Sequence, residues 1–580
     1  SGSGDYEDFS STIFKVNEGK TYPITITDSY SPGYDLGYVV YIDYNNDSDF
    51  DDSNEIALSG SDGESFTGNI VIPTEDIIFN TNLRMRVVGY TDFVSPCKAG
   101  VGQFEDYTIN VVRNIWNGTT STDWDVATNW STGEVPTTGS NVIIPANITN
   151  KPIATGAITL NKLTLLENAS LTVQGAVTNT DIISIESGAS FIAKESVSGV
   201  VKYTRFLPAK NKWYLAAPPV SNVDLEELIE NNVFAKGTGT NIGIATYNTN
   251  SDSWSYSSTN STGSLTSAEG YSMRLAGPGS VSFTGNMQTL NSLTIPIDNP
   301  GQGYNLIGNP YASYIPVNNS ADSNYNLLKM NDADNDFLAE TTLWFWDQSL
   351  NSGQGAYNAL NHASSKRYVA PGQAFFVKAN GNHNFIFSED MQSHQETDVF
   401  NRSSEDRLEI ELTVSDGTNS SKTEIYYING TTTGWDNGYD SSIFNSSNSN
   451  LTVYTELVSD NNGEKLQIQS LPNSNYKEMV IPVSLKGKAG TSVTFKIDAI
   501  NIPTDLNVIL EDKELETFTI LESTTNEYTV SLANDNLIDN RFYIHVNTPS
   551  ILSSESFITE NIKIFTINKN EKLRVTGIFN

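Results

Sequence analysis

Residues 37–55 have the sequence GYVVYIDYNNDSDFDDSNE, in which β-branched and aromatic residues lead directly into a loop of Asp and Asn. Similar alternating runs recur along the chain, for example at 408–414, and Gly, Asn, Asp or Pro punctuates them about every 8–12 residues. This pattern predicts an all-β protein of tandem β-sandwiches, Ig-like or jelly-roll-like, with a short β-solenoid segment. One stretch, 224–230, has helical spacing instead and predicts a short surface helix, with Ser221 or Asp224 as its N-cap.

Length and charge narrow the class of protein. At about 150 residues per domain, 580 residues predict roughly four domains. Lys and Arg number 33 against 68 Asp and Glu, so the formal net charge is −35, and we expect no nucleic acid partner. No segment approaches the roughly 18–20 apolar residues of a membrane helix, so we expect no direct membrane span. Polar positions filled by Ser, Thr, Asn and Gly are typical of an extracellular β-rich protein.

The N-terminus and the single cysteine bear on processing and redox state. The opening SGSG resembles an added linker, and no signal peptide follows it, so we expect that a signal has been removed and that the natural protein extends upstream. Cys97 is the only cysteine, which excludes an internal disulfide. It is either a buried free thiol or half of a disulfide whose partner lies outside this sequence.

The acidic loop that begins at residue 43 has the spacing of a calcium-binding loop. Oxygen-bearing side chains occupy alternate positions, and Ca²⁺ takes about six to eight oxygen ligands. The spacing matches the first half of an EF-hand loop, except that Ser48 replaces the turn glycine and a strand precedes the loop. The alternative is a solvated acidic hairpin loop, since Asn and Asp favour turns. The predicted ligands of a structural Ca²⁺ are Asp43, Asn45, Asp47, Asp49, Asp51 and Glu55.

Residues 1–114 resemble the GEVED domain of secreted Bacteroidetes proteins. The resemblance rests on YVVYIDYNNDSDFDDSNE, on LRMRVVGY and on GVGQFEDYTINV. The family usually has G-E-V-E-D-Y where this chain has GQFEDY at 102–107, so the acidic pair and the tyrosine remain while the first glutamate is lost. GEVED domains occur as accessory β-sandwiches in adhesin-like proteins and beside catalytic domains. The resemblance therefore implies a module rather than a chemistry.

Residues 115–195 contain short runs of apolar residues at uneven intervals. These runs predict the β-solenoid, in which each turn stacks on the one before it. Three tryptophans, Trp116, Trp124 and Trp130, lie at its start. They are expected to cap the first turn and to be partly buried, and the alternative is an aromatic platform for sugars.

Residues 196–396 predict a further β-sandwich. Phrases such as GYNLIGNPYASYIPV resemble a region that precedes the sorting domain in surface proteins of gliding and polymer-degrading Bacteroidetes. Short aromatic-rich runs predict core positions for Trp213, Trp344, Trp346, Phe375 and Phe376. A second acidic loop is either flexible or a second Ca²⁺ site with the ligands Asp332, Asp334, Asp336 and Glu340.

Residues 397–548 resemble the Ig-like sandwich that precedes type IX secretion signals, and 549–580 resemble the opening strands of a type A C-terminal sorting domain. The usual later strands of that domain are missing, so we expect a truncation here as well. The resemblance implies a secreted or outer cell-surface location. It also implies the type IX translocon and its shuttle and attachment proteins as partners.

Catalytic motifs are not found. The sequence has no H-E-x-x-H, no G-x-S-x-G and no Cys/His metal cluster, and its four histidines are scattered. We therefore expect no enzyme activity in these residues. The hypothesis is an adhesin-like or surface-interaction protein with structural Ca²⁺ and surface polysaccharide as a candidate partner. Its alternatives are a non-catalytic accessory region of a larger secreted hydrolase and a stalk without a ligand.

Overall fold

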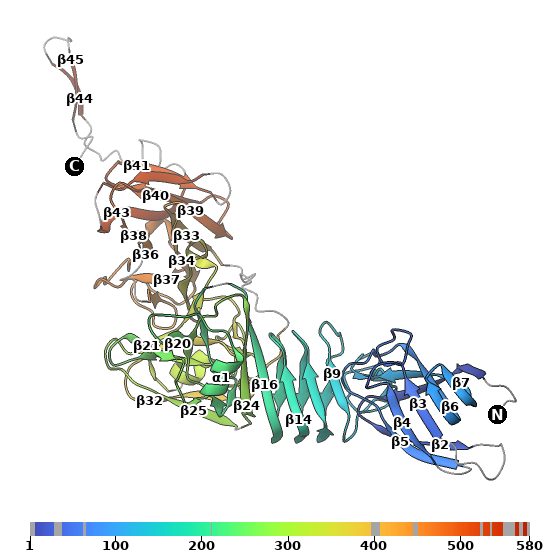
Figure 1. Cartoon of the computed structure of the whole chain (residues 1–580). Coiled ribbons are helices and arrows are strands. Elements are labelled where there is room, and N and C mark those ends of the chain that lie inside the picture. The colour runs from blue at the N-terminus through green and yellow to red at the C-terminus, as the bar shows by residue number, and fades with distance from the viewer. Residues whose placement is uncertain are drawn as a thin grey trace.

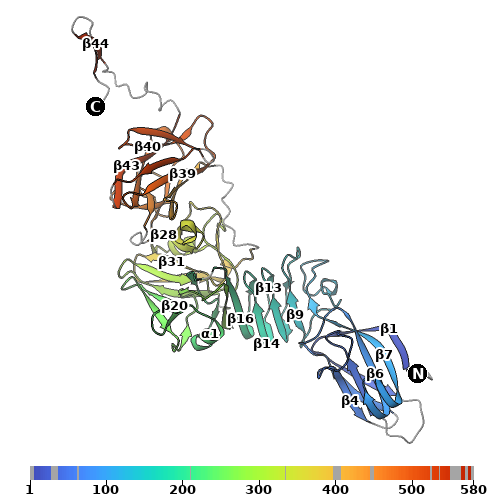
Figure 2. The same cartoon turned by 45° about the horizontal axis from the view of Figure 1, so that its top comes forward.

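The computed structural model describes residues 6–27, 37–61, 65–209, 211–289, 291–333, 335–395, 407–444, 450–522, 526–533, 536–548, 563–567 and 572–576. These residues form an all-β protein, which confirms the predicted fold class. The β-units follow one another along an elongated molecule (Figure 1). The same succession is evident when the molecule is turned (Figure 2).

The first unit is a sandwich of two sheets. Its strands are β1 (Tyr6–Asn17), β2 (Thr21–Thr27), β3 (Gly37–Ile42), β4 (Ile56–Ser61), β5 (Ser65–Val71), β6 (Asn82–Ser95) and β7 (Lys98–Val112). The larger sheet has the order β1-β7-β6-β3-β4, and β2 pairs with β5. Val40 and Ile42 are buried between the layers, whereas Val39 and Tyr41 pack with Phe50 on the other face. Burial on both faces explains why β3 is a continuous apolar run.

The solenoid follows directly. Its elements are β8 (Asn114–Ile115), η1 (Ala127–Asn129), β9 (Asn141–Ile144), β10 (Ile153–Ala154), β11 (Ile158–Leu160), β12 (Lys162–Leu165), β13 (Ser170–Val173), β14 (Val177–Ile185), β15 (Ser190–Ala193) and β16 (Val197–Leu207). Parallel pairing aligns Val142, Leu163, Ile183 and Val201 in one ladder, and all four are buried. Stacking of like positions gives each turn its core and confirms the predicted solenoid.

The solenoid sheet does not end at residue 195. The strand β16 extends it in parallel, and β24 (Gly279–Met287) and β18 (Val220–Ser221) then continue it with antiparallel pairing. One apolar core runs from Trp116 to Ala312. The solenoid and the start of the third unit therefore share both a sheet and a core.

The third unit contains several small sheets, ordered β17-β23-β20-β21, β26-β31-β28-β29, β25-β32, β27-β30 and β19-β22. The strands are β17 (Tyr214–Ala216), β19 (Val223–Asp224), β20 (Asn241–Asn248), β21 (Ser253–Ser258), β22 (Ser264–Leu265), β23 (Tyr271–Met273), β25 (Ser292–Ile297), β26 (Tyr304–Gly308), β27 (Ile315–Pro316), β28 (Leu338–Asp347), β29 (Ala356–Leu360), β30 (Tyr368–Val369), β31 (Ala374–Ala379) and β32 (His383–Ser388). The helices are α1 (Leu225–Asn231), η2 (Lys329–Ala333), α2 (Leu350–Gly353) and η3 (Glu389–Met391).

Two sequence predictions for this unit can be compared with the structure. The predicted short helix is α1, and Asp224 rather than Ser221 caps it by accepting a hydrogen bond from the Glu227 amide at 3.0 Å. Core positions are correct for the fully buried Trp344, Phe375 and Phe376. They are wrong for Trp213 and Trp346, which are only half-buried because both rings border an open cleft.

The strands of the fourth unit hydrogen-bond into one eleven-stranded sheet around a single core. They are β33 (Glu409–Ser415), β34 (Ser420–Ile428), β35 (Ser441–Ser442), β36 (Thr452–Thr455), β37 (Leu466–Pro472), β38 (Val480–Gly487), β39 (Ser492–Ile500), β40 (Asn507–Asp512), β41 (Thr517–Leu521), β42 (Tyr528–Ser531) and β43 (Asn536–Asn547), with η5 (Tyr476–Glu478) between β37 and β38. Strands from both ends of the sheet contribute to that core, so the sheet closes over it as a sandwich does.

The sorting-domain prediction falls mostly outside the described residues. Within 549–580, the structure describes the antiparallel strands β44 (Lys563–Ile567) and β45 (Lys572–Thr576).

Candidate metal centre in the first sandwich

The acidic loop connects β3 to β4. Antiparallel pairing of these strands places Asp43, directly after β3, close to Glu55, directly before β4. The Ile42 amide donates to the Glu55 carbonyl at 2.9 Å, and the Asp43 amide donates to the Arg84 carbonyl in β6 at 3.0 Å. Strand pairing therefore fixes both ends of the loop.

Inside the loop, backbone amides point at carboxylates. The Asp43 carboxylate accepts hydrogen bonds from the amides of Asp47 and Ser48, each at 3.1 Å, and the Asp47 carboxylate accepts one from the Asp49 amide at 3.1 Å. Asn46 and Ser48 have φ angles of 57° and 79°. At Ser48 the chain thus adopts the left-handed conformation that a turn glycine usually supplies.

Three of the predicted ligands come together. Carboxylate oxygens of Asp43, Asp47 and Glu55 lie within 4.8 Å of one another. Asp43 is 3% exposed and Glu55 is fully buried, whereas Asp47 is exposed. The cluster therefore has one side in the protein and one side open to solvent.

Glu55 is the least satisfied member of this cluster. Its Oε1 atom is buried and has no hydrogen-bond partner among the described residues. Burial, together with the nearby charges of Asp43, Asp47 and Asp52, raises the pKa of Glu55 to about 7. A bare cluster of this kind is electrostatically unfavourable when it is ionised. A hard cation would satisfy its oxygens and offset its charge.

The remaining predicted ligands lie around the cluster. The Asn45 side-chain amide donates to Asp47 at 2.9 Å and to Asp52 at 2.5 Å. Asp49 and Asp51 are exposed, and the Asp49 carboxylate accepts a hydrogen bond from the Asp51 amide at 2.9 Å. Asp52 was not predicted, because an alternate-position rule skips it, although it belongs to the same acidic run.

The second predicted site has a different arrangement. Glu340 is 5% exposed and already binds the Lys378 ammonium at 2.7 Å and the Ser442 hydroxyl at 2.6 Å. The Asp332 carboxylate accepts from the Thr341 hydroxyl, and Asp336 is exposed. Asp334 lies outside the described residues. Among those that are described, these side chains do not gather into a cluster of ligand atoms.

Sequence comparison finds one matching family for the first sandwich and another for the region that follows it. Residues 115–546, well over half of the chain, match the family named Domain of unknown function (DUF8693). The chain belongs to the DUF8693 family. Residues 37–110 match the GEVED domain, which confirms that resemblance and includes the whole acidic loop. GEVED domains are commonly found in surface or secreted proteins. No curated protein matches the chain.

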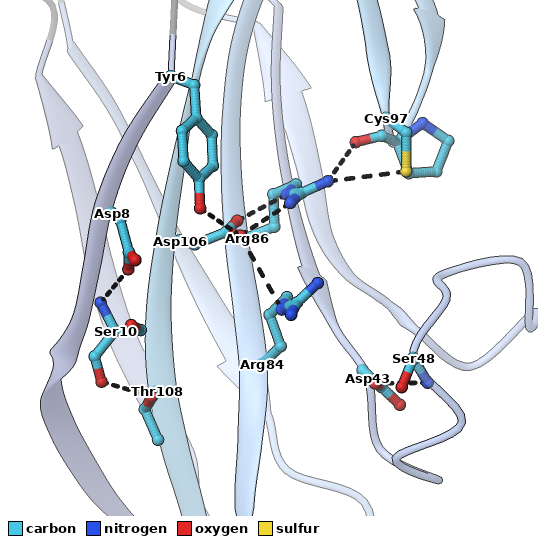
Figure 3. A network of polar contacts seen from close by, with 11 residues as sticks. Tyr6, Asp8, Ser10, Asp43, Ser48, Arg84, Arg86, Cys97, Asp106 and Thr108 are labelled. Carbon is cyan, nitrogen blue, oxygen red and sulfur yellow. Dashed lines mark hydrogen bonds and ion pairs between the residues drawn. The ribbon is translucent and has the colours of Figure 1, made fainter.

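The GEVED-type motif of this DUF8693 protein is structural. Asp106 accepts from Arg86 Nε and Nη2 at 2.6 and 2.8 Å and from the Tyr6 hydroxyl at 3.2 Å (Figure 3). The Tyr107 hydroxyl donates to Glu105 at 2.7 Å. Asp106 thus ties β1, β6 and β7 together, whereas Glu105 and Tyr107 pair within β7. All three lie outside the carboxylate cluster. Gly102 is required there, because a Cβ would lie 2.3 Å from the Gly89 carbonyl oxygen.

The burial of the three tryptophans and of the single cysteine can also be compared with the sequence expectations. Trp116, Trp124 and Trp130 of the DUF8693 region are at most 2% exposed and pack ring against ring, so they cap the solenoid core and form no sugar platform. Cys97 is an exposed thiol rather than a buried one, and Arg86 Nη1 lies 3.7 Å from its sulfur (Figure 3). Within the described residues, no helix has the length and hydrophobicity needed to cross a membrane.

Proposed function

We propose that the chain is a secreted protein of the outer cell surface with an adhesin-like or other surface-interaction role, in which Ca²⁺ stabilises the first sandwich. The observation that carries the proposal is the continuous packing of residues 115–546. Its GEVED domain supports an extracellular location, since such domains are common in surface and secreted proteins. No catalytic step is assigned to it.

Contacts between the third and fourth units hold these two parts of the DUF8693 region rigidly together. The Trp344 indole donates to the Ser442 carbonyl at 3.0 Å, and the Thr342 and Ser441 hydroxyls lie 2.7 Å apart, fully buried. Phe444 packs at 4.4 Å between ring centroids against Tyr304. Buried contacts of this kind resist bending. A stiff rod suits a protein that projects binding surfaces away from a cell.

The calcium part of the proposal rests on Asp43, Asp47 and Glu55. Their carboxylate oxygens converge, and Glu55 Oε1 is buried without a hydrogen-bond partner in the described part of the chain. Ca²⁺ prefers oxygen ligands over nitrogen or sulfur. Bound Ca²⁺ would neutralise the loop and connect the end of β3 to the start of β4.

Thermal unfolding tests the calcium site. Ca²⁺ at about 100 times its Kd adds about 2.7 kcal/mol, and each kcal/mol raises the Tm of a domain of this size by about 4–8 °C. We expect Ca²⁺ to raise the Tm of the first sandwich and the double variant Asp43→Ala/Asp47→Ala to abolish the rise. The matched control, Glu75→Gln/Asp76→Asn, removes the same number of negative charges from exposed positions outside the loop and should keep it. A wild-type Tm that is the same in Ca²⁺ and in chelator would contradict the proposal.

The interaction role is tested by binding of the full chain to immobilised polysaccharides and bacterial surface polymers, in Ca²⁺ and in chelator. Binding to one polymer class supports it. Absence of binding in both buffers would favour the stalk or the accessory region.

Type IX secretion is part of the proposal, with the translocon and its shuttle and attachment proteins as partners of the C-terminal end. Its support is the resemblance of residues 549–580 to the first strands of a sorting domain. In a host with that system, we expect the natural protein to reach the cell surface and a variant without this segment to remain inside. Surface display of the shortened variant would argue against this route.

A further inference from the structure

An open cleft lies in the third unit, far along the chain from the acidic loop. Its floor is a row of residues directly opposite one another across the sheet β17-β23-β20-β21, namely Leu215, Ser272, Ala245 and Tyr256. The two central residues, Ser272 and Ala245, are small, so the middle of the row is hollow. The cavity volume is about 210 Å³.

Aromatic rings surround the hollow. They are Trp213, Trp254, Tyr256, Trp346 and Tyr357, from β21, β28, β29 and the residue before β17. Trp213 lies 5.9 Å from Tyr256 and Trp346 lies 5.0 Å from Tyr357, measured between ring centroids. None of the five is buried, and Tyr256 is 50% exposed. The other four rings are partly buried, and each still contributes surface to the cleft.

The backbone is shaped to hold one of these rings in place. Gly355 has φ of +91°, and a Cβ there would lie 2.4 Å from the Trp346 ring. Only glycine allows the chain to lie this close to the indole in that conformation.

Polar groups at the cleft lack protein partners. Among the described residues, the Ser272 hydroxyl, the Tyr357 hydroxyl and the indole N–H groups of Trp213 and Trp254 make no hydrogen bond. Ser272 is 7% exposed and lines the cleft, so its hydroxyl is open to a ligand there. Donors and acceptors therefore adjoin flat apolar rings and are free for a ligand.

The charge and size of the cleft identify the ligand class. None of the described residues that line the cleft is acidic or basic. The Arg274 guanidinium lies 5.8 Å from the Trp213 ring centroid, outside the lining, and the chain as a whole carries −35, which disfavours an anionic ligand. A sugar ring presents weakly positive C–H groups to the negative face of an aromatic ring and hydroxyls at its edge. A proline-rich peptide also binds aromatic grooves, but it needs a longer groove than one of about 210 Å³.

We propose that this cleft binds a neutral sugar ring of an extracellular polysaccharide, which stacks on the tryptophans and hydrogen-bonds to Ser272. The inference deepens the proposed surface-interaction role, rests on it, and places the ligand in the DUF8693 region rather than in the calcium-loop sandwich.

The test uses the full chain and neutral oligosaccharides of β-glucan, xylan, mannan and starch, with intrinsic tryptophan fluorescence as the readout. We expect at least one of them to shift the emission saturably. Tyr256→Ala should weaken its affinity about tenfold, equivalent to ~1.4 kcal/mol, and Trp213→Ala at least as much. Ser272→Ala should weaken it less and leave the emission shift in place.

The matched control is Tyr325→Ala. This tyrosine is 44% exposed and does not line the cleft, so its loss should leave the affinity unchanged. An unchanged Tm shows that each variant folds. No response to any of the oligosaccharides, a response only to a decaproline peptide, or full affinity in Tyr256→Ala would overturn the inference. If Tyr256→Ala still binds the immobilised polymers as the wild type does, the cleft is excluded while the interaction role stands.

Discussion

Asp512 and Glu55 are both buried carboxylates, but different side chains surround them. Asp512 is 1% exposed and accepts from Arg541 Nε and Nη2 at 2.9 and 2.8 Å. Burial alone would raise the pKa of Asp512, but hydrogen bonds and the charge of Arg541 hold it below its usual value. Among the described residues Glu55 has no cationic partner, and burial raises its pKa. Asp512 is therefore satisfied within the fold, whereas Glu55 is not.

The Asp512 pair gives a prediction at this scale. Asp512→Asn removes the buried counter-charge of the Arg541 guanidinium and leaves it the carboxylate of Glu514, which is about half exposed. We expect a loss of up to about 3–5 kcal/mol in stability. The Tm of the transition in which the fourth unit unfolds measures it. Lys496→Ala is the control, because its pair with Glu527 is about half exposed and worth at most about 1 kcal/mol. Similar losses in the two variants would contradict the prediction.

At the scale of elements, His394 adds to the shared sheet and core that join the solenoid to the third unit. The His394 ring accepts or donates at 2.8 Å to the Thr172 hydroxyl in β13 and at 2.8 Å to the Ser190 hydroxyl in β15. The two strands are hydrogen-bonded neighbours, so the ring bridges two turns of the solenoid. A neutral imidazole suits two hydroxyls, which can each turn to donate or accept.

This contact predicts a pH dependence of the junction. Burial, together with the charge of Lys151, lowers the pKa of His394 to about 4, while the unfolded value is near 6.5. The contribution is therefore present above pH 6.5 and is lost as the pH falls toward 4. Between pH 8 and pH 5 we expect a loss of about 2 kcal/mol.

Thermal unfolding at the two pH values measures this loss. His394→Gln keeps a hydrogen-bonding side chain but cannot titrate, so its pH dependence should be smaller by that amount. Equal pH dependence in the variant and the wild type would show that other groups cause it.

At the scale of the whole molecule, the four units differ in how they are joined. The third and fourth units share an apolar cluster that contains Trp344 and Phe376 from one side and Tyr426, Phe444 and Ile468 from the other. Neither unit covers this surface alone. We therefore expect the third and fourth units of the DUF8693 region to unfold together as one cooperative unit.

A fragment experiment checks this. A chain of residues 407–548 alone would expose Phe444 and Ile468 to water, and we expect it to self-associate or to unfold well below the Tm of the same residues within 115–548. Light scattering and thermal unfolding of both fragments measure the difference. A monomeric 407–548 fragment with an unchanged Tm would show that the units are independent.

Local features follow from the sequence alone. Period-two alternation and frequent turn residues predict strands, the short apolar runs of 143–192 predict a solenoid, and Asp and Asn at alternate positions predict a loop that collects oxygens. These features can be predicted because residues close together in the sequence determine a strand, a turn or one turn of the solenoid.

Tertiary structure alone decided how distant residues meet. The closeness of Glu55 to Asp43 depends on the pairing of β3 with β4, and the engagement of Glu340 depends on Ser442, which is 102 residues away. The same aromatic pattern gives a buried Trp344 and a half-buried Trp346 two residues later. Alternation of residues along a strand predicts that its side chains point to two faces of the sheet. Only the packing between sheets decides which of these faces is buried. For that reason the cleft could not be predicted from the tryptophans that line it.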